Sequence, residues 1–229
     1  DELLNQKQNI LKYTDELSEQ FARTNFDDVS NLYKKAFEQF KKGKIEKSIE
    51  ILETVNQNSN DKNKINSADI WTMKLSSQMY MMTFQYQKAD DTYHALWKID
   101  TTNVQNTNSY ASFLEQRKQY KKSILFYKKL LQLDIKNWRK GETYRSIGMI
   151  YQDMKKLSQS LEYYKKYNDM YEKLYKVERH NTFYNKNLAL SSLSLGLIYQ
   201  EQGKFEPAEK ALIRSKELFI ELQQENPQN

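Results

Sequence analysis

The chain has 229 residues, of which 38% are hydrophobic and 29% are charged, a balance typical of a water-soluble protein with a sizeable core. Its formal net charge of +6 is modest for this length, and no apolar stretch reaches the roughly 20 residues that a transmembrane helix needs. The absence of cysteine excludes disulfides, thiol catalysis and cysteine-based metal sites. Only 5 glycines and 2 prolines interrupt the sequence, which favours long helices over strands and turns.

Residues 1–28 are predicted to form one amphipathic helix. Leu3, Ile10 and Leu17 recur at a spacing of seven residues, which places them on one side of a helix. Two interpretations stay open, because three heptads are too few to choose between them. The helix either caps the array that follows it or forms the end of an upstream coiled coil.

From residue 29 to residue 229 the sequence predicts five pairs of helices, which begin near residues 29, 70, 104, 141 and 189. Each first helix carries a small residue at which the second helix can approach closely, while large side chains fill the space around it. These small residues are Ala36, Ser77, Ala111, Gly148 and Gly196. Gly43 and Gly203 fall between the two helices of a pair, where a residue in the left-handed conformation ends the first helix.

The fourth and fifth pairs share one spaced pattern. It reads Ile147-Gly148-x-x-Tyr151-x-x-x-Lys155-x-Leu157-x-x-Ser160 in the fourth pair and Leu195-Gly196-x-x-Tyr199-x-x-x-Gly203-x-Phe205-x-x-Ala208 in the fifth. This pattern resembles the tetratricopeptide repeat (TPR), a helix–turn–helix unit of about 34 residues. The step of 48 residues from Gly148 to Gly196 is longer, as in extended bacterial TPR arrays. The resemblance implies an all-α fold, a right-handed α-α superhelix of stacked helix pairs.

The last predicted helix carries an apolar stripe of Leu218, Phe219 and Leu222. A natural solenoid end usually carries a polar cap. We therefore expect the array to be truncated at its C-terminus, although the alternative that this helix is the natural end stays open. The stripe also predicts self-association through the last helix.

No motif in the sequence indicates an enzyme. The two histidines, His94 and His180, are interpreted as surface residues. The sequence contains no HExxH or GxSxG motif, no glycine-rich phosphate loop and no dinucleotide-binding fingerprint. We therefore expect no catalytic residue, no bound metal and no cofactor.

The resemblance implies a protein-binding function. In TPR proteins the first helix of each repeat lines a concave groove and contacts the ligand from fixed positions. Carried onto this chain, those positions give the candidate groove residues Tyr33, Phe37, Phe40, Trp71, Lys74, Gln78, Met81, Met82, Asn108, Arg145, Leu193 and Leu197. The aromatic and methionine side chains of the first two repeats suit adaptable recognition of a peptide or helix. Alternatively, they pack against the N-terminal helix, and the leucines of the fifth repeat pack against the fourth.

We expect a protein or peptide partner of unknown identity. Lysine pairs such as Lys121-Lys122 and Lys165-Lys166 alternate with tyrosines, a pattern that can bind nucleic acid. These lysines fall on the predicted outer faces of second helices among acidic residues, so we interpret them as solvated surface. A regulatory TPR region of a larger bacterial signalling protein is the first alternative, and a nucleic-acid-binding array is the second. We expect no membrane insertion by this chain, and the cytoplasm is slightly favoured over the periplasm.

Overall fold

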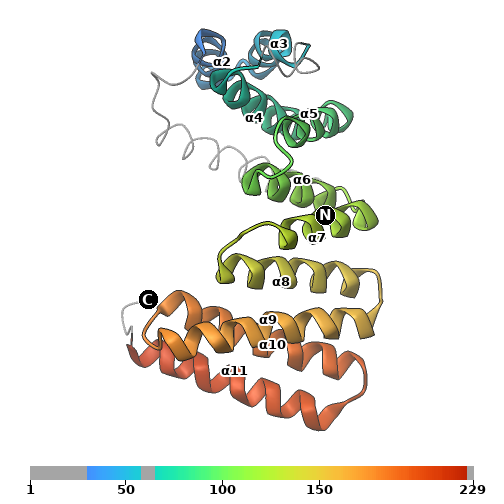
Figure 1. Cartoon of the computed structure of the whole chain (residues 1–229), viewed down its shortest axis with the longest axis vertical. Coiled ribbons are helices and arrows are strands. Elements are labelled where there is room, and N and C mark those ends of the chain that lie inside the picture. The colour runs from blue at the N-terminus through green and yellow to red at the C-terminus, as the bar shows by residue number, and fades with distance from the viewer. Residues whose placement is uncertain (1–29, 58–64, 226–229) are drawn as a thin grey trace. The chain divides into compact units, whose positions relative to one another are not determined.

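The structure, a computed structural model, describes residues 30–57 and 65–225 (Figure 1). The predicted N-terminal helix at residues 1–28 lies outside the described residues. Within them the chain forms ten α-helices and no strand, so the predicted all-α class is confirmed. The helices are α2 (Asn31–Lys41), α3 (Ile45–Asn56), α4 (Ser67–Met82), α5 (Tyr86–Ile99), α6 (Val104–Gln116), α7 (Tyr120–Gln132), α8 (Asn137–Asp153), α9 (Leu157–Val177), α10 (Thr182–Glu201) and α11 (Phe205–Glu225).

The chain divides into two compact units, residues 1–113 and residues 114–229, here called unit 1 and unit 2. In unit 1, α2 packs against α3, α3 against α4, and α4 against α5. In unit 2, α8, α9, α10 and α11 pack against one another in chain order (Figure 1). We call α2, α4, α6, α8 and α10 first helices, and α3, α5, α7, α9 and α11 second helices.

The turn between the two helices of each described pair has the same backbone geometry. One residue in the left-handed conformation lies two positions before each second helix. Gly43 (φ 70°) and Gly203 (φ 71°) occupy this place as predicted. In the other three turns the residue has a side chain, namely Phe84 (φ 59°), Lys118 (φ 54°) and Lys155 (φ 58°). A non-glycine residue in this conformation is strained by contact between its Cβ and the backbone.

The predicted close approach of the paired helices is confirmed at Gly148 and Gly196. A Cβ atom on Gly148 would lie 2.8 Å from the Tyr164 ring, and one on Gly196 would lie 2.6 Å from the Leu212 side chain. Hydroxyl groups of the second helices also reach the first-helix backbone, because Ser160 donates a hydrogen bond to the Gly148 carbonyl (2.9 Å). Ser48 and Ala36 form the same contact in the first pair (2.6 Å).

Four buried tyrosines of α9 belong to the core of unit 2, and we call them the tyrosine row: Tyr164, Tyr167, Tyr171 and Tyr175. They follow one side of the helix at spacings of three or four residues. Tyr164 donates a hydrogen bond to Gln152 of α8 (2.8 Å), whereas Tyr167 donates one to Asn187 of α10 (3.1 Å). Burial raises the pKa of Tyr164 to about 12, and it also raises the pKa values of Tyr167 and Tyr171.

The raised tyrosine pKa values predict a loss of stability at alkaline pH. A hydroxyl whose pKa is higher in the folded state contributes stability that is present below the ordinary tyrosine pKa and is lost as the pH rises through the folded value. The free energy of unfolding in urea should therefore fall as the pH rises from 10.0 towards 12. Tyr164→Phe should make this fall less steep. An unchanged slope in that variant would contradict the assignment.

The turn geometry predicts opposite effects of two substitutions in equivalent turns. Lys155→Gly should raise the free energy of unfolding by about 1 kcal/mol, because glycine adopts positive φ without steric strain. Gly203→Ala should lower it by about 1 kcal/mol for the converse reason, although there is open space around Gly203 for the added methyl group. Urea denaturation measures both changes. Equal signs for the two variants would exclude backbone strain as their cause.

Candidate binding surface

The first helices of unit 1 carry an accessible aromatic side chain beside lysine. Trp71 of α4 is 37% exposed, and the Lys74 ammonium lies 5.2 Å from the centre of its ring. Burial lowers the pKa of Lys74. Phe37 of α2 is half-buried, with the Lys41 ammonium 4.7 Å from its ring centre. Phe40, Gln78 and Asn108 are half-buried. We call Phe37, Phe40, Trp71, Lys74 and Gln78 the unit-1 face.

Three of the predicted groove residues lie in the core instead. Tyr33, Met81 and Met82 are 3%, 7% and 5% exposed, so they offer a partner almost no surface. The physical reason is clearest for the two methionines, because α4 contacts α2, α3 and α5 and is covered on more than one side. We therefore leave these three residues out of the proposed binding surface.

The first helices of unit 2 present a second face, formed by α8 and α10. Met149 and Leu197 are 42% and 45% exposed, while Leu190 and Leu193 are half-buried. Gln152 of α8 donates a hydrogen bond to Glu201 of α10, which places the C-terminal ends of the two helices side by side. We call the following residues the α8–α10 face: Glu142, Arg145, Met149, Gln152 and Asp153 of α8, and Leu190, Leu193, Leu197 and Glu201 of α10.

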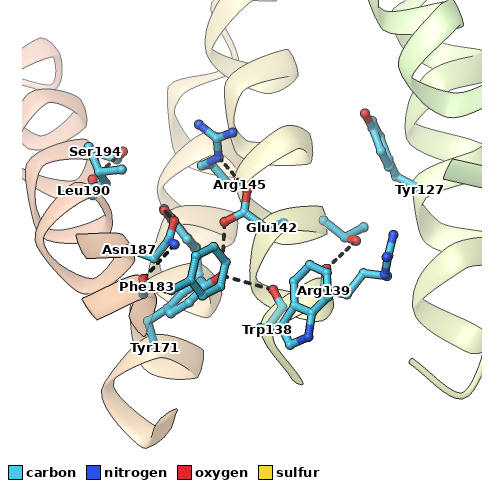
Figure 2. A network of polar contacts seen from close by, with 12 residues as sticks. Tyr127, Trp138, Arg139, Glu142, Arg145, Tyr171, Phe183, Asn187, Leu190 and Ser194 are labelled. Carbon is cyan, nitrogen blue, oxygen red and sulfur yellow. Dashed lines mark hydrogen bonds and ion pairs between the residues drawn. The ribbon is translucent and has the colours of Figure 1, made fainter. Parts of the chain in front are cut away.

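Second-helix tyrosines hold the polar residues of this face in place (Figure 2). The Tyr171 hydroxyl lies 3.1 Å from a Glu142 oxygen and 3.1 Å from the Trp138 carbonyl. The other Glu142 oxygen lies 3.3 Å from Nε of Arg145, the one predicted groove residue of α8. Figure 2 shows Glu142 between Tyr171 and Arg145. Arg145 is therefore oriented by α9 through a carboxylate, and 41% of its side chain stays exposed.

Three carboxylates of unit 2 lie at or near the C-terminal ends of α6, α8 and α10, and we call them the acidic row. Tyr127 donates a hydrogen bond to Glu115 (2.6 Å) and Tyr120 donates one to Asp153 (3.1 Å), while Glu201 accepts its bond from Gln152. Burial raises the pKa of Glu115. These three residues are not among the groove residues predicted from the sequence, because isolated carboxylates at helix ends carry no motif.

The described residues contain no group of three or more histidine, cysteine, aspartate or glutamate side chains that could hold a metal ion. In the same part of the chain, no helix is long and apolar enough to span a membrane. His180 is exposed as predicted, but His94 is half-buried. Its ring stacks against those of Trp97 and Tyr110, with ring centres 5.9 and 5.6 Å away. His94 is therefore a partly buried residue rather than a freely exposed one.

Comparison with known proteins identifies the type of repeat. Residues 141–174, which include α8 from Gly141 onward and most of α9, match the family model described as tetratricopeptide repeat. No curated protein matches the sequence.

Solved structures of helical-repeat proteins share the fold. A crystal structure of MamA superposes with a TM-score of 0.59 and 17% identity, covering 82% of this chain and 96% of that one. The crystal structure of BtubC (BKLC) from P. vanneervenii superposes with a TM-score of 0.61 and 17% identity, covering 82% of this chain and 78% of that one. The crystal structure of a putative kinesin light chain with TPR-like repeats from Podosopora anserina superposes with a TM-score of 0.61 and 12% identity, covering 84% of this chain and 95% of that one. Residues 141–174 are thus a tetratricopeptide repeat, in a chain whose described helices have the TPR-like helical-repeat fold.

Proposed function

We propose that this protein is a non-enzymatic scaffold that binds a segment of a partner protein on the exposed faces of its first helices. TPR-like folds serve in general as scaffolds for protein–protein interaction, and the fold alone does not name the partner. The observation that carries the proposal is the α8–α10 face. Met149 and Leu197 are each more than two-fifths exposed at equivalent positions of neighbouring repeats.

The composition of the α8–α10 face suits recognition of a peptide or helix. Apolar side chains such as Met149 and Leu197 contribute affinity by removing their surface from water, at about 25 cal/mol per Å². Arg145 and Glu201 are held by hydrogen bonds or an ion pair before a partner arrives. Side chains that are already ordered lose less conformational entropy on binding, which favours affinity and specificity. The unit-1 face offers Trp71 and Lys74 for the same kind of contact.

This function predicts that Leu197→Ser weakens partner binding by about 10- to 100-fold, because burying one leucine side chain contributes roughly 1.5–3 kcal/mol. Leu125→Ser is the matched control, since Leu125 lies on the second helix α7 and is 53% exposed. Affinity capture from a lysate of the source cells, followed by mass spectrometry, compares both variants with the unaltered chain. A partner lost by the Leu197 variant and kept by the control is the expected result.

Trp71→Ala belongs in the same capture experiment and tests the unit-1 face independently. Absorbance of the captured material detects nucleic acid. Equal capture by all variants, or capture of only nucleic acid that salt removes, would contradict the proposed function. In that case the exposed lysines of the second helices would become the candidate binding surface.

A specific observation also supports self-association through α11. Ile213, Phe219 and Ile220 are 50%, 38% and 43% exposed, whereas Leu218 of the predicted stripe is buried. Phe219 lies 48 residues after Tyr171, whose ring packs against Phe183 and Tyr184 of the next first helix. Phe219 of α11 thus corresponds to Tyr171 of α9, which packs against the next helix, α10. We propose that a second copy of the chain covers the corresponding surface of α11.

Self-association through this surface predicts a dimer in sedimentation velocity that Ile220→Lys dissociates, because a charge would be buried without a partner. Lys216→Glu is the control for a change of charge on the same helix at an exposed position. A monomer at every protein concentration would contradict the proposal.

A further inference from the structure

The α8–α10 face has two parallel rows of different chemistry. One row is apolar and consists of Met149 and Leu197. Asp153 and Glu201 each lie four residues further along the same helices, which is about 6 Å along the helix axis. Residues at this spacing share one side of a helix. A segment crossing α8 and α10 would therefore meet apolar side chains along one edge and carboxylates along the other.

The acidic row is fixed across repeats. Tyr120 of α7 holds Asp153 of α8, and Gln152 of α8 holds Glu201 of α10. Glu115 extends the row towards α6, where Tyr127 holds it. These hydrogen bonds come from uncharged donors, so they orient the carboxylates without neutralising them.

No cation in the described part of the chain forms an ion pair with the acidic row, although the charge of Arg145 acts on Glu115 and partly counters the rise of the Glu115 pKa. Among the described residues, neither Asp153, Glu201 nor Glu115 lies in an ion pair. Arg145, the cation of the face, is paired with Glu142. The lysines that follow the row, Lys155 and Lys204, lie in the turns and are exposed.

From this arrangement we infer that the partner segment bound by the α8–α10 face is amphipathic and basic, with apolar side chains along one edge and Lys or Arg along the other. The inference rests on the proposed function and adds the chemistry of the partner. Charge complementarity steers association and selects partners more than it adds affinity. The apolar row would supply most of the affinity, and the acidic row would reject acidic segments.

A phage-displayed library of short random peptides, selected against the whole chain, tests this inference. Peptides that Leu197→Ser fails to bind and Leu125→Ser retains are those that occupy the α8–α10 face. We expect them to combine apolar residues with Lys or Arg and to bind more weakly as salt increases. Replacing the basic residues of a selected peptide by glutamate should abolish its binding in fluorescence anisotropy.

The matching protein variant is Asp153→Asn combined with Glu201→Gln, which keeps the side-chain shapes and removes two charges. It should weaken binding of the basic peptide by about tenfold, because exposed charge pairs contribute up to about 1 kcal/mol each. Asp169→Asn with Glu209→Gln is the control, since it removes two exposed carboxylates from second helices. Circular dichroism confirms that both variants stay folded.

The outcomes separate this inference from the function on which it rests. Peptides that need Leu197 but are neutral or acidic, or that tolerate loss of Asp153 and Glu201, would overturn the basic partner and leave the binding face in place. A selection in which no binding peptide depends on Leu197 would overturn the binding face itself.

Discussion

The close approach of α8 and α9 at two glycines is the constraint on which the rest of unit 2 depends. A Cβ atom would lie 2.5 Å from the Tyr171 ring at Gly141 and 2.8 Å from the Tyr164 ring at Gly148. Because glycine leaves this space empty, two large aromatic rings fit between the helices in the core. Their hydroxyl groups then reach back to polar residues of α8.

Each glycine is thereby connected to the exposed face. Tyr164 donates to Gln152, which in turn donates to Glu201 of the next repeat. Tyr171 hydrogen bonds to Glu142, which pairs with Arg145. The second helix thus supplies the buried packing and also fixes the side chains that a partner would meet.

The parts of this fold that depend on spacing along one helix pair could be predicted from the sequence. The small residues at Gly148 and Gly196 and the left-handed turns at Gly43 and Gly203 belong to this group, because glycine is the residue that such geometry favours. The equivalent turns at Phe84 and Lys118 could not be predicted, since these residue types carry no turn signal, whereas Lys155 occupies the place of Gly203 in the shared pattern.

Features that depend on several helices at once were not predictable. Met81 and Met82 occupy first-helix positions that face a groove in an ideal repeat, but α4 is covered by three other helices and buries them. The acidic row was also missed, because the order of Asp153 and Glu201 comes from hydrogen bonds between different repeats. Periodicity identifies the side of a helix on which a residue lies, whereas neighbouring helices determine whether that side is exposed.

The most direct test of the claim that the first-helix face binds the partner is methyl NMR spectroscopy of the whole chain during titration with a selected peptide. The methyl resonances of Met149 and Leu197 should shift as the peptide binds, while those of Leu125 and Ile213 on second helices should stay in place. Shifts confined to Leu125 or Ile213 would contradict the account and assign binding to the second helices.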